Sequence, residues 1–160
     1  RKGISYVPQD IHLFGGTIKQ NILGIHKFID DEWMLECSKI SGTDEFVRMH
    51  PAGYDMPLGE RGAGLSGGQR QSVGIARALI NNSDIWMFDE PTNAMDQTSE
   101  SIVLNNLMSK VEGKTLLLVT QKMSMVDLVD RIIVMNFGSK VLDGPKDEII
   151  NKLGNSGEKQ

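Results

Sequence analysis

The chain has 160 residues, of which 39% are hydrophobic and 24% are charged. This balance is typical of one globular domain and excludes a disordered or fibrous protein. Seventeen basic and 21 acidic side chains leave a net charge of −4, which argues against broad nucleic-acid binding because that needs clustered Lys and Arg. The lone cysteine, Cys37, excludes an internal disulfide framework and a metal site built from several thiolates.

Segments typical of membrane insertion or targeting are not visible in the sequence. Its longest apolar runs, such as 116–119 and 132–135, are far shorter than the roughly 20 residues that cross a bilayer. The first residues lead straight into a strand-like stretch, without the charged and apolar regions of a signal peptide. Because the sequence also begins without Met, we expect it to be a piece of a longer polypeptide.

The first 64 residues predict one strand and three short helices. In chain order we expect a strand at 4–7, a helix from an N-cap at Thr17 through Leu23, a helix that begins at Asp30 or Asp31, a helix near 43–49 and a Gly- and Pro-rich loop at 51–64. Pro8 is expected to end the first strand, since proline cannot donate a ladder hydrogen bond.

The remaining residues alternate between helical and strand patterns. In chain order we expect a helix that begins at Ser66 and ends at 81–82, a strand at 85–88, a helix at 98–111, strands at 116–119 and 132–135, a hairpin turn at 136–138, a strand at 140–142, a helix whose first turn begins at Pro145 and a polar tail at 154–160. Gln69 follows Ser66 by three residues, which predicts a capping box. The alternation predicts a mostly parallel sheet, and the apolar runs at 85–88 and 116–119 predict buried strands.

The string LSGGQ at 65–69 opens the clearest helix of the chain. Its two glycines expose backbone N–H groups at a helix N-terminus, where the helix dipole favours phosphate. The Ser66 hydroxyl can cap the helix or donate to a phosphate oxygen. The alternative reading is a capped surface helix that follows a flexible loop.

The apolar run at 85–88 ends in Asp89 and Glu90, as in a Walker B element. The first carboxylate can hold Mg²⁺, and the second can polarise a water for attack on a γ-phosphate. Acids at a strand end also occur by chance, but this pair follows the glycine-rich helix start by about 20 residues, which strengthens the interpretation.

These residues resemble the nucleotide-binding domain of an ATP-binding cassette (ABC) transporter of exporter type, over the C-terminal two-thirds of that domain. The matching motifs are the Q-loop at 7–10, the segment before the signature at 60–62, the signature at 65–69, the Walker B end at 89–90 and the D-loop at 93–96. The resemblance implies an α/β fold of the P-loop NTPase class, with a mostly parallel sheet and an α-helical subdomain. It divides the chain into 1–10 (core strand and Q-loop), 11–64 (helical subdomain), 65–153 (signature helix and core) and 154–160 (flexible tail).

The resemblance also assigns roles to single residues, with ATP and Mg²⁺ as cofactors. Gln9 would contact Mg²⁺ or the attacking water, Asp89 would hold Mg²⁺, and Glu90 would be the general base. The expected nucleotide-binding residues are Ser66, Gly67, Gly68, Gln69 and Asp96. The signature would touch the γ-phosphate of ATP held by the opposite subunit, and Asp96 would link the two sites.

Two stretches, 90–100 (EPTNAMDQTSE) and 118–135 (LVTQKMSMVDLVDRIIVM), are similar to the ATPases of type I protein secretion. This similarity implies a homodimer of nucleotide-binding domains, a transmembrane domain of the same transporter, an exported protein as substrate and no nucleic-acid partner. It places the chain at the cytoplasmic face of the bacterial inner (plasma) membrane.

The chain departs from the family by lacking a Walker A motif. Gly113-Lys114-Thr115 is not this motif, because Met108 stands where a glycine is needed and a strand follows. A turn is expected there instead. In family members the Walker A motif lies upstream of where this chain begins, so we expect a fragment that supplies the signature half of a site and whose sheet exposes apolar surface.

A second departure is Gln121, which stands where the family has its switch histidine. Glutamine can donate a hydrogen bond to a γ-phosphate, but it carries no charge and cannot shuttle a proton. An alternative function is therefore a regulatory ATP-binding module with a weakly hydrolytic site. A more remote alternative, a DNA-repair or chromosome ABC ATPase, is disfavoured because only 55 residues separate Gln9 from Leu65, without sustained heptads.

Overall fold

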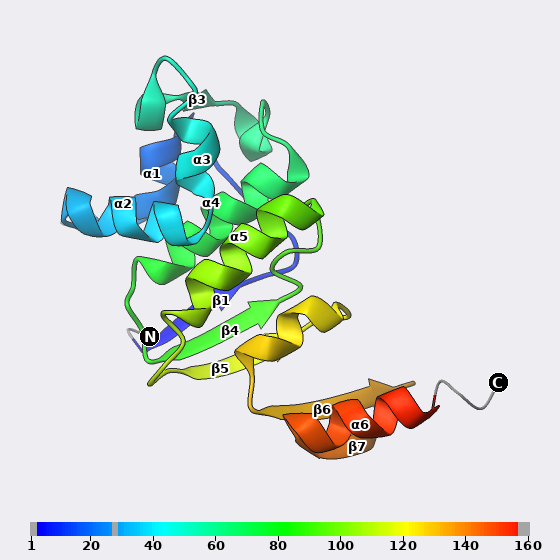
Figure 1. The fold of residues 1–160 in the computed structure, drawn as a ribbon. Helices are drawn as coiled ribbons and strands as arrows, with labels where there is room; N and C mark the ends of the chain where they lie inside the picture. The colour runs from blue at the N-terminus through cyan, green and yellow to red at the C-terminus, as the bar shows by residue number, and fades with distance from the viewer. Residues whose placement is uncertain (1–2, 27–28, 157–160) are drawn as a thin grey trace. The chain divides into compact units, whose positions relative to one another are not determined.

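A computed structural model describes residues 3–26 and 29–156, with side chains to residue 154 (Figure 1). The chain divides into two compact units between Gln121 and Lys122. In the first unit the elements are β1 (Ile4–Val7), β2 (Gly16–Thr17), α1 (Ile18–Leu23), α2 (Asp31–Ile40), α3 (Thr43–Val47), η1 (Gly53–Asp55), β3 (Pro57–Leu58), η2 (Glu60–Gly62), α4 (Gly67–Leu79), β4 (Ile85–Asp89), α5 (Gln97–Met108) and β5 (Thr115–Val119).

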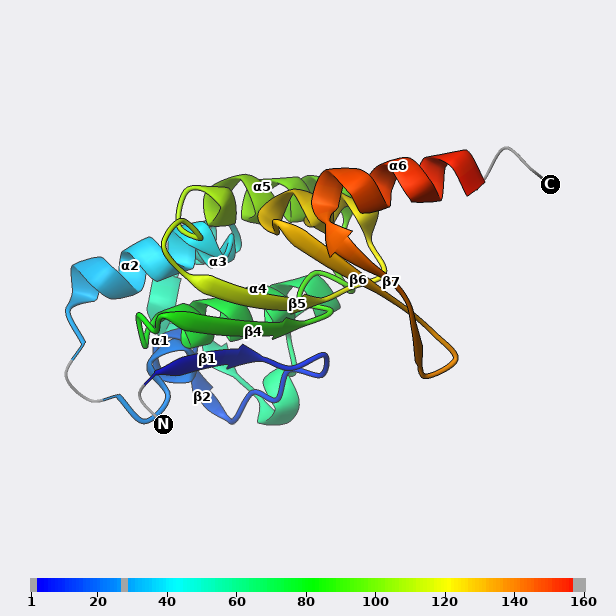
Figure 2. The same cartoon turned by 90° about the horizontal axis from the view of Figure 1, so that it is seen from below.

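The first unit is built on a parallel sheet of order β1-β4-β5, which confirms the predicted parallel pairing. Helices α4 and α5 lie on the same side of this sheet (Figures 1 and 2). Alternate residues of the strands face these helices and are buried, among them Val7, Trp86 and Phe88. The indole of Trp86 stacks on the ring of Phe88, with centroids 5.6 Å apart.

The opposite face of the sheet is apolar and exposed. Four of its side chains, Ile4, Tyr6, Leu117 and Val119, are each about half exposed, at 47%, 55%, 54% and 54%. The expectation of exposed apolar sheet surface is therefore confirmed, whereas the prediction that 85–88 and 116–119 are buried strands fails for the exposed face of the sheet. A continuous apolar run predicts that both faces of the strand are shielded from water, but it does not identify the segment that covers each face.

The segment at 51–64 contains more structure than the loop that its glycines and prolines predict. It includes two 3₁₀ turns and the two-residue strand β3, which pairs antiparallel with β2. The pair is short and joins residues about 40 positions apart, as in Gly16 opposite Leu58. No local pattern marks such a pairing, so the sequence could not predict it.

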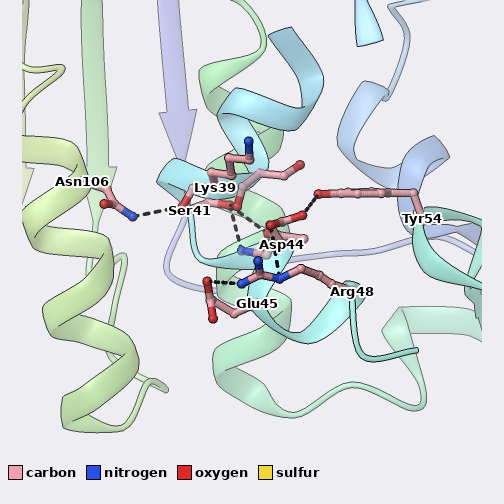
Figure 3. A network of polar contacts seen from close by, with 9 residues as sticks. Lys39, Ser41, Asp44, Glu45, Arg48, Tyr54 and Asn106 are labelled. Atoms are coloured by element: carbon pink, nitrogen blue, oxygen red, sulfur yellow. Dashed lines mark hydrogen bonds and ion pairs between the residues drawn. The ribbon is translucent and has the colours of Figure 1, made fainter. Parts of the chain in front are cut away.

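Helices α2 and α3 pack on α4 and are tied to α5 by a polar network (Figure 3). The side-chain amide of Asn106, on α5, donates to the carbonyl oxygen of Lys39 at 3.0 Å, at the end of α2. The phenol of Tyr54 donates to a carboxylate oxygen of Asp44 at 2.9 Å, and Arg48 pairs with both Asp44 and Glu45. These contacts hold the end of α2, α3 and the turn at η1 together.

The second unit consists of η3 (Met123–Leu128), β6 (Arg131–Asn136), β7 (Ser139–Pro145) and α6 (Lys146–Ser156). Strands β6 and β7 form the predicted hairpin, in which Asp143 pairs with Arg131 and Lys140. Pro145 does not begin the last helix but ends β7 opposite Arg131, because the hairpin continues farther than its apolar residues indicate. Helix α6 extends into the expected tail, of which residues 157–160 lie outside the described residues.

None of the helices in the described part of the chain combines the length and the apolar character needed to cross a membrane.

Candidate functional site

The signature string forms the capped first turn of α4, as predicted. The hydroxyl oxygen of Ser66 accepts from the N–H of Gln69 at 3.1 Å, and the side-chain oxygen of Gln69 accepts from the N–H of Ser66 at 2.9 Å. The first N–H groups of a helix have no acceptor within the helix, and here two of them belong to Gly67 and Gly68. The positive end of the α4 dipole therefore carries no side chain of its own at these two positions.

The signature glycines are also required by the D-loop, which lies directly against them. A Cβ atom on Gly67 would stand 3.0 Å from the Cβ atom of Ala94. One on Gly68 would stand 3.1 Å from the carbonyl oxygen of Ala94 and 3.3 Å from the Cα atom of Met95. Glycine at these positions thus serves two purposes. It leaves the N–H groups at the helix end without a side chain, and it lets the D-loop backbone approach the helix closely.

Asp96 ends the D-loop as the N-cap of α5. Its carboxylate accepts from the backbone N–H of Ser99 at 2.9 Å and from the hydroxyl of Ser99 at 2.8 Å. These two hydrogen bonds lower the pKa of Asp96 below its ordinary value, because they stabilise the charged form. The carboxylate is exposed, so it presents a fixed negative charge beside the signature.

A cavity of about 290 Å³ lies between α3 and the first turns of α4 and α5. Four of the predicted nucleotide-binding residues line it, namely Ser66, Gly68, Gln69 and Asp96, and Phe46 contributes apolar surface. We call this group of signature and D-loop residues, together with Gly67, the signature cluster. The structure brings all five predicted nucleotide-binding residues together there.

The predicted catalytic and metal-binding residues lie together at a different edge, where the three parallel strands end. Gln9 follows β1, Asp89 ends β4 and Glu90 comes directly after it, and Gln121 follows β5. The register places Val7 opposite Phe88, and Asp89 opposite Val119, so the carboxyl ends of the strands are level. Ligands of parallel sheets commonly bind at this edge. We call these four residues the strand-end cluster.

Glu90 has an unusual backbone conformation at the end of β4. Its φ angle of 45° lies in the left-handed region that few non-glycine residues adopt. Its N–H donates to the carbonyl oxygen of Val119 at 2.9 Å, and the side chain is 8% exposed. Strained backbone of this kind persists only where surrounding contacts hold it, and it is common at functional sites.

The strand-end cluster offers oxygen ligands of the kind that Mg²⁺ prefers. Mg²⁺ prefers oxygen ligands and is commonly held by one or two carboxylates together with phosphate oxygens. Asp89 offers a carboxylate that is partly exposed, and Gln9 offers an exposed amide oxygen at the neighbouring strand end. Within the described ranges, no group of three or more His, Cys, Asp or Glu side chains is arranged to hold a metal ion.

Gly113-Lys114-Thr115 forms the turn between α5 and β5, which confirms that it is not a phosphate loop. Gly113 has a φ angle of 75°, and the N–H of Lys114 donates to the carbonyl oxygen of Val111 at 2.9 Å. The ammonium group of Lys114 lies 3.5 Å from a carboxylate oxygen of Asp84. Lys114 therefore forms an ion pair at the amino end of the parallel strands, and the strand-end cluster lies at their carboxyl end.

Sequence reasoning missed two polar residues of α4 that hold the site in place. Gln71 is buried and contacts the backbone of both Glu90 and Ala94. The guanidinium group of Arg77 donates to the carbonyl oxygens of His12 and Asn21 and to the Asn21 side chain. In the sequence, the one sign of these contacts was that both polar residues lie on a helix with many apolar positions.

Comparisons with known proteins identify the family. The family model described as "ABC transporter" matches residues 1–93. The leukotoxin translocation ATP-binding proteins LktB of Mannheimia haemolytica and Mannheimia glucosida are each 40% identical over 150 residues, which is 94% of this chain and 21% of theirs. The chain thus spans about a fifth of the length of these relatives.

A solved structure supports the same assignment at the level of the fold. The structure of a bacterial Atm1-family ABC exporter with ATP bound superposes with a TM-score of 0.88 and 31% sequence identity, over 95% of this chain and 27% of that chain. The predicted α/β fold of an ABC ATPase domain is therefore confirmed. This chain belongs to the ABC transporter family.

Proposed function

We propose that the chain is part of the ATP-hydrolysing domain of an exporter, in which it supplies the signature and the Walker B residues. The single observation that carries the proposal is the pairing of a glycine-bared helix end with two carboxylates at the end of the central strand, within one unit of an ABC transporter family member. The first group suits phosphate binding and the second suits hydrolysis. Neither group alone would favour an ATPase as strongly.

The signature cluster binds the γ-phosphate of ATP that the opposite subunit holds. The N–H groups of Gly67 and Gly68 are available at the end of α4, and the Ser66 hydroxyl, which accepts from Gln69, still has a proton to donate. Asp96, kept charged by its hydrogen bonds to Ser99, meets the neighbouring subunit and links the two sites. Binding of ATP by two copies therefore closes a dimer.

The strand-end cluster carries out hydrolysis. Asp89 and Gln9 would hold Mg²⁺, which would neutralise charge on the phosphate oxygens. Glu90 orients the attacking water and accepts its proton as the general base. Gln121 donates a hydrogen bond to the γ-phosphate, in the place that a histidine takes in the family.

The intact protein contains a membrane domain and exports a protein from the cytoplasmic face of the bacterial plasma membrane. This part of the proposal rests on the 40% identity to proteins named for leukotoxin translocation. The residues that follow Gln9, including α1 to α3, transmit dimer closure to the membrane domain. The substrate would be a secreted protein, as in type I secretion.

The replacement of Glu90 by Gln tests the function in the full-length protein that contains this chain. We expect E90Q to lower ATP turnover by about 10² to 10⁴ and to leave ATP binding intact, because the amide keeps the shape and loses the base. The matched control is E112Q, which changes an exposed carboxylate outside both clusters and should keep normal turnover. Undiminished turnover in E90Q would reject the proposed base.

A second candidate function, a regulatory module that binds ATP and hydrolyses it slowly, is favoured by Gln121. This residue is exposed directly beyond β5 and carries no proton-shuttling group. Single-turnover hydrolysis of the full-length protein should be compared with that of Q121H. A large gain in rate for Q121H would favour the regulatory module, and similar rates would favour an ordinary ATPase.

A further inference from the structure

Gln71 is a buried side chain whose two polar atoms contact two separate parts of the site. It lies on α4 and is 5% exposed. Its Nε2 atom donates to the carbonyl oxygen of Glu90 at 3.2 Å, and its Oε1 atom accepts from the N–H of Ala94 at 2.8 Å. The amide therefore spans the turn that leads from the strand-end cluster to the signature cluster.

The first contact acts on the strained peptide of Glu90. The N–H of Glu90 is held by β5, through the carbonyl oxygen of Val119 at 2.9 Å. The carbonyl oxygen of Glu90 accepts from Gln71 and, at 3.2 Å, from the N–H of Asn93. With both sides of the residue held, the φ angle of 45° is maintained and the direction of the Glu90 side chain is set.

The second contact acts on the D-loop. Ala94 donates its N–H to Gln71 and at the same time packs against the first turn of α4, where a Cβ atom on Gly67 or Gly68 would make an unusually close contact. Since Gln71 lies on the second turn of the same helix, α4 holds the segment from Glu90 to Ala94 at both ends. Contacts therefore run without a break from the helix end at Gly68, through Ala94 and Gln71, to the backbone of Glu90.

We propose that Gln71 is a positioning residue that fixes Glu90 relative to the signature helix. The inference rests on the proposed function, in which one subunit gives its signature to one ATP and its Glu90 to the other. Through Gln71, phosphate bound at the signature of a subunit sets the position of the general base in that same subunit. The two ATP sites are thereby coupled inside one chain, through a single amide.

The test uses Q71M in the full-length protein, because Met is close to Gln in volume and removes both hydrogen bonds. We expect kcat for ATP hydrolysis to fall at least about tenfold while KM changes by less than about twofold, since nucleotide contacts remain. Q71E separates the two contacts when its carboxylate is ionised, because it then keeps an acceptor for Ala94 and loses the donor to Glu90. Its kcat should therefore fall as the pH rises and recover at low pH, where the protonated carboxyl can donate again. The matched control is N105A, which removes an exposed amide from α5 and should leave kcat unchanged.

A double-mutant cycle with E90Q shows whether Gln71 acts through Glu90. We expect Q71M to lower turnover in the native background and to have no further effect on the residual single-turnover rate in the E90Q background. Equal rate losses in both backgrounds, or a native kcat in Q71M, would overturn the inference. Full turnover in E90Q alone would instead reject the proposed function, so the two failures are distinguishable.

Discussion

The signature cluster and the strand-end cluster differ in how their functional groups are held. In the signature cluster, most of the proposed phosphate contacts are made by main-chain N–H groups, which are fixed by a capping box and by the close approach of Ala94 to Gly67 and Gly68. In the strand-end cluster, Gln9 and Gln121 are exposed side chains that follow the ends of strands. The difference indicates a rigid half, the signature cluster, and a half that is adjustable at Gln9 and Gln121, with the backbone of Glu90 held on both sides between them.

Among the changes that test this difference between the two clusters, the largest effect is expected from G68A, which would disturb the signature cluster. Its Cβ atom would meet the backbone of Ala94 and Met95, and backbone cannot move aside as a flexible side chain can. We expect ATP turnover of the full-length protein to fall by about 10². G154A, in α6, has open space around its Cβ and provides a control that should retain turnover. Normal turnover in G68A would show that the close packing is dispensable.

The next effect is expected from Arg77, which joins α4 to the segment that follows Gln9. Burial lowers the pKa of its guanidinium group, so three acceptors from His12 and Asn21 are needed to offset the cost of the charge. Replacement by Ala should lower the free energy of unfolding by about 3 kcal/mol. Urea unfolding measures this value. A loss of stability no larger than that of the exposed Glu112→Ala change would contradict the assigned role.

A smaller effect is expected in the pH dependence of stability, which depends on two groups in the helices that support α4. Burial raises the pKa of the Cys37 thiol and of the Tyr54 phenol to about 12. Both groups keep their protons in the folded chain. In the unfolded chain the thiol loses its proton at about pH 8.5 and the phenol at about pH 10, as free side chains do. The stability that the neutral forms provide is thus complete below these values and is lost as the pH rises towards 12.

Unfolding measured in urea between pH 8 and pH 12 checks this prediction. Stability should fall with rising pH, and the fall should be shallower in Cys37→Ala and in Tyr54→Phe. A flat profile for the native sequence would mean that neither group is held in its neutral form.

The smallest effect on stability is expected in the adjustable half. Gln9→Ala and Gln121→Ala remove exposed side chains, so the free energy of unfolding should change by less than about 0.5 kcal/mol. ATP turnover should nevertheless fall, because both side chains are proposed to contact the reacting groups. A large loss of stability in either variant would show that these side chains are structural, and it would contradict the proposed difference between the two clusters.

Local signals predicted most of the first unit. Thr17, Asp30 and Ser66 are N-caps in the structure, and two of them form capping boxes with the residue three positions later. The order of strands and helices also predicted that Gln9, Glu90 and Gln121 would follow strand ends. These features depend on neighbours in the sequence or on the common direction of parallel strands, which a single sequence contains.

Contacts between segments that are distant in the sequence could not be predicted from local patterns. The hydrogen bonds of Gln71 reach residues 19 and 23 positions away, and those of Arg77 reach 56 and 65 positions back. A polar side chain within a helix gives no sign of a partner so far along the chain. The exposed sheet face is a similar case, since the apolar run at 116–119 does not specify what covers it.

The most direct test of the account is amide hydrogen exchange at residues 65–69 in the full-length protein. If α4 binds the phosphates of ATP, the N–H groups of Gly67 and Gly68 become hydrogen-bonded and their exchange slows when ATP and Mg²⁺ are added to the E90Q variant. A peptide from the exposed hairpin turn at 136–138 serves as the reference. Exchange at 65–69 that stays unchanged at saturating ATP would contradict the proposed role of the signature helix.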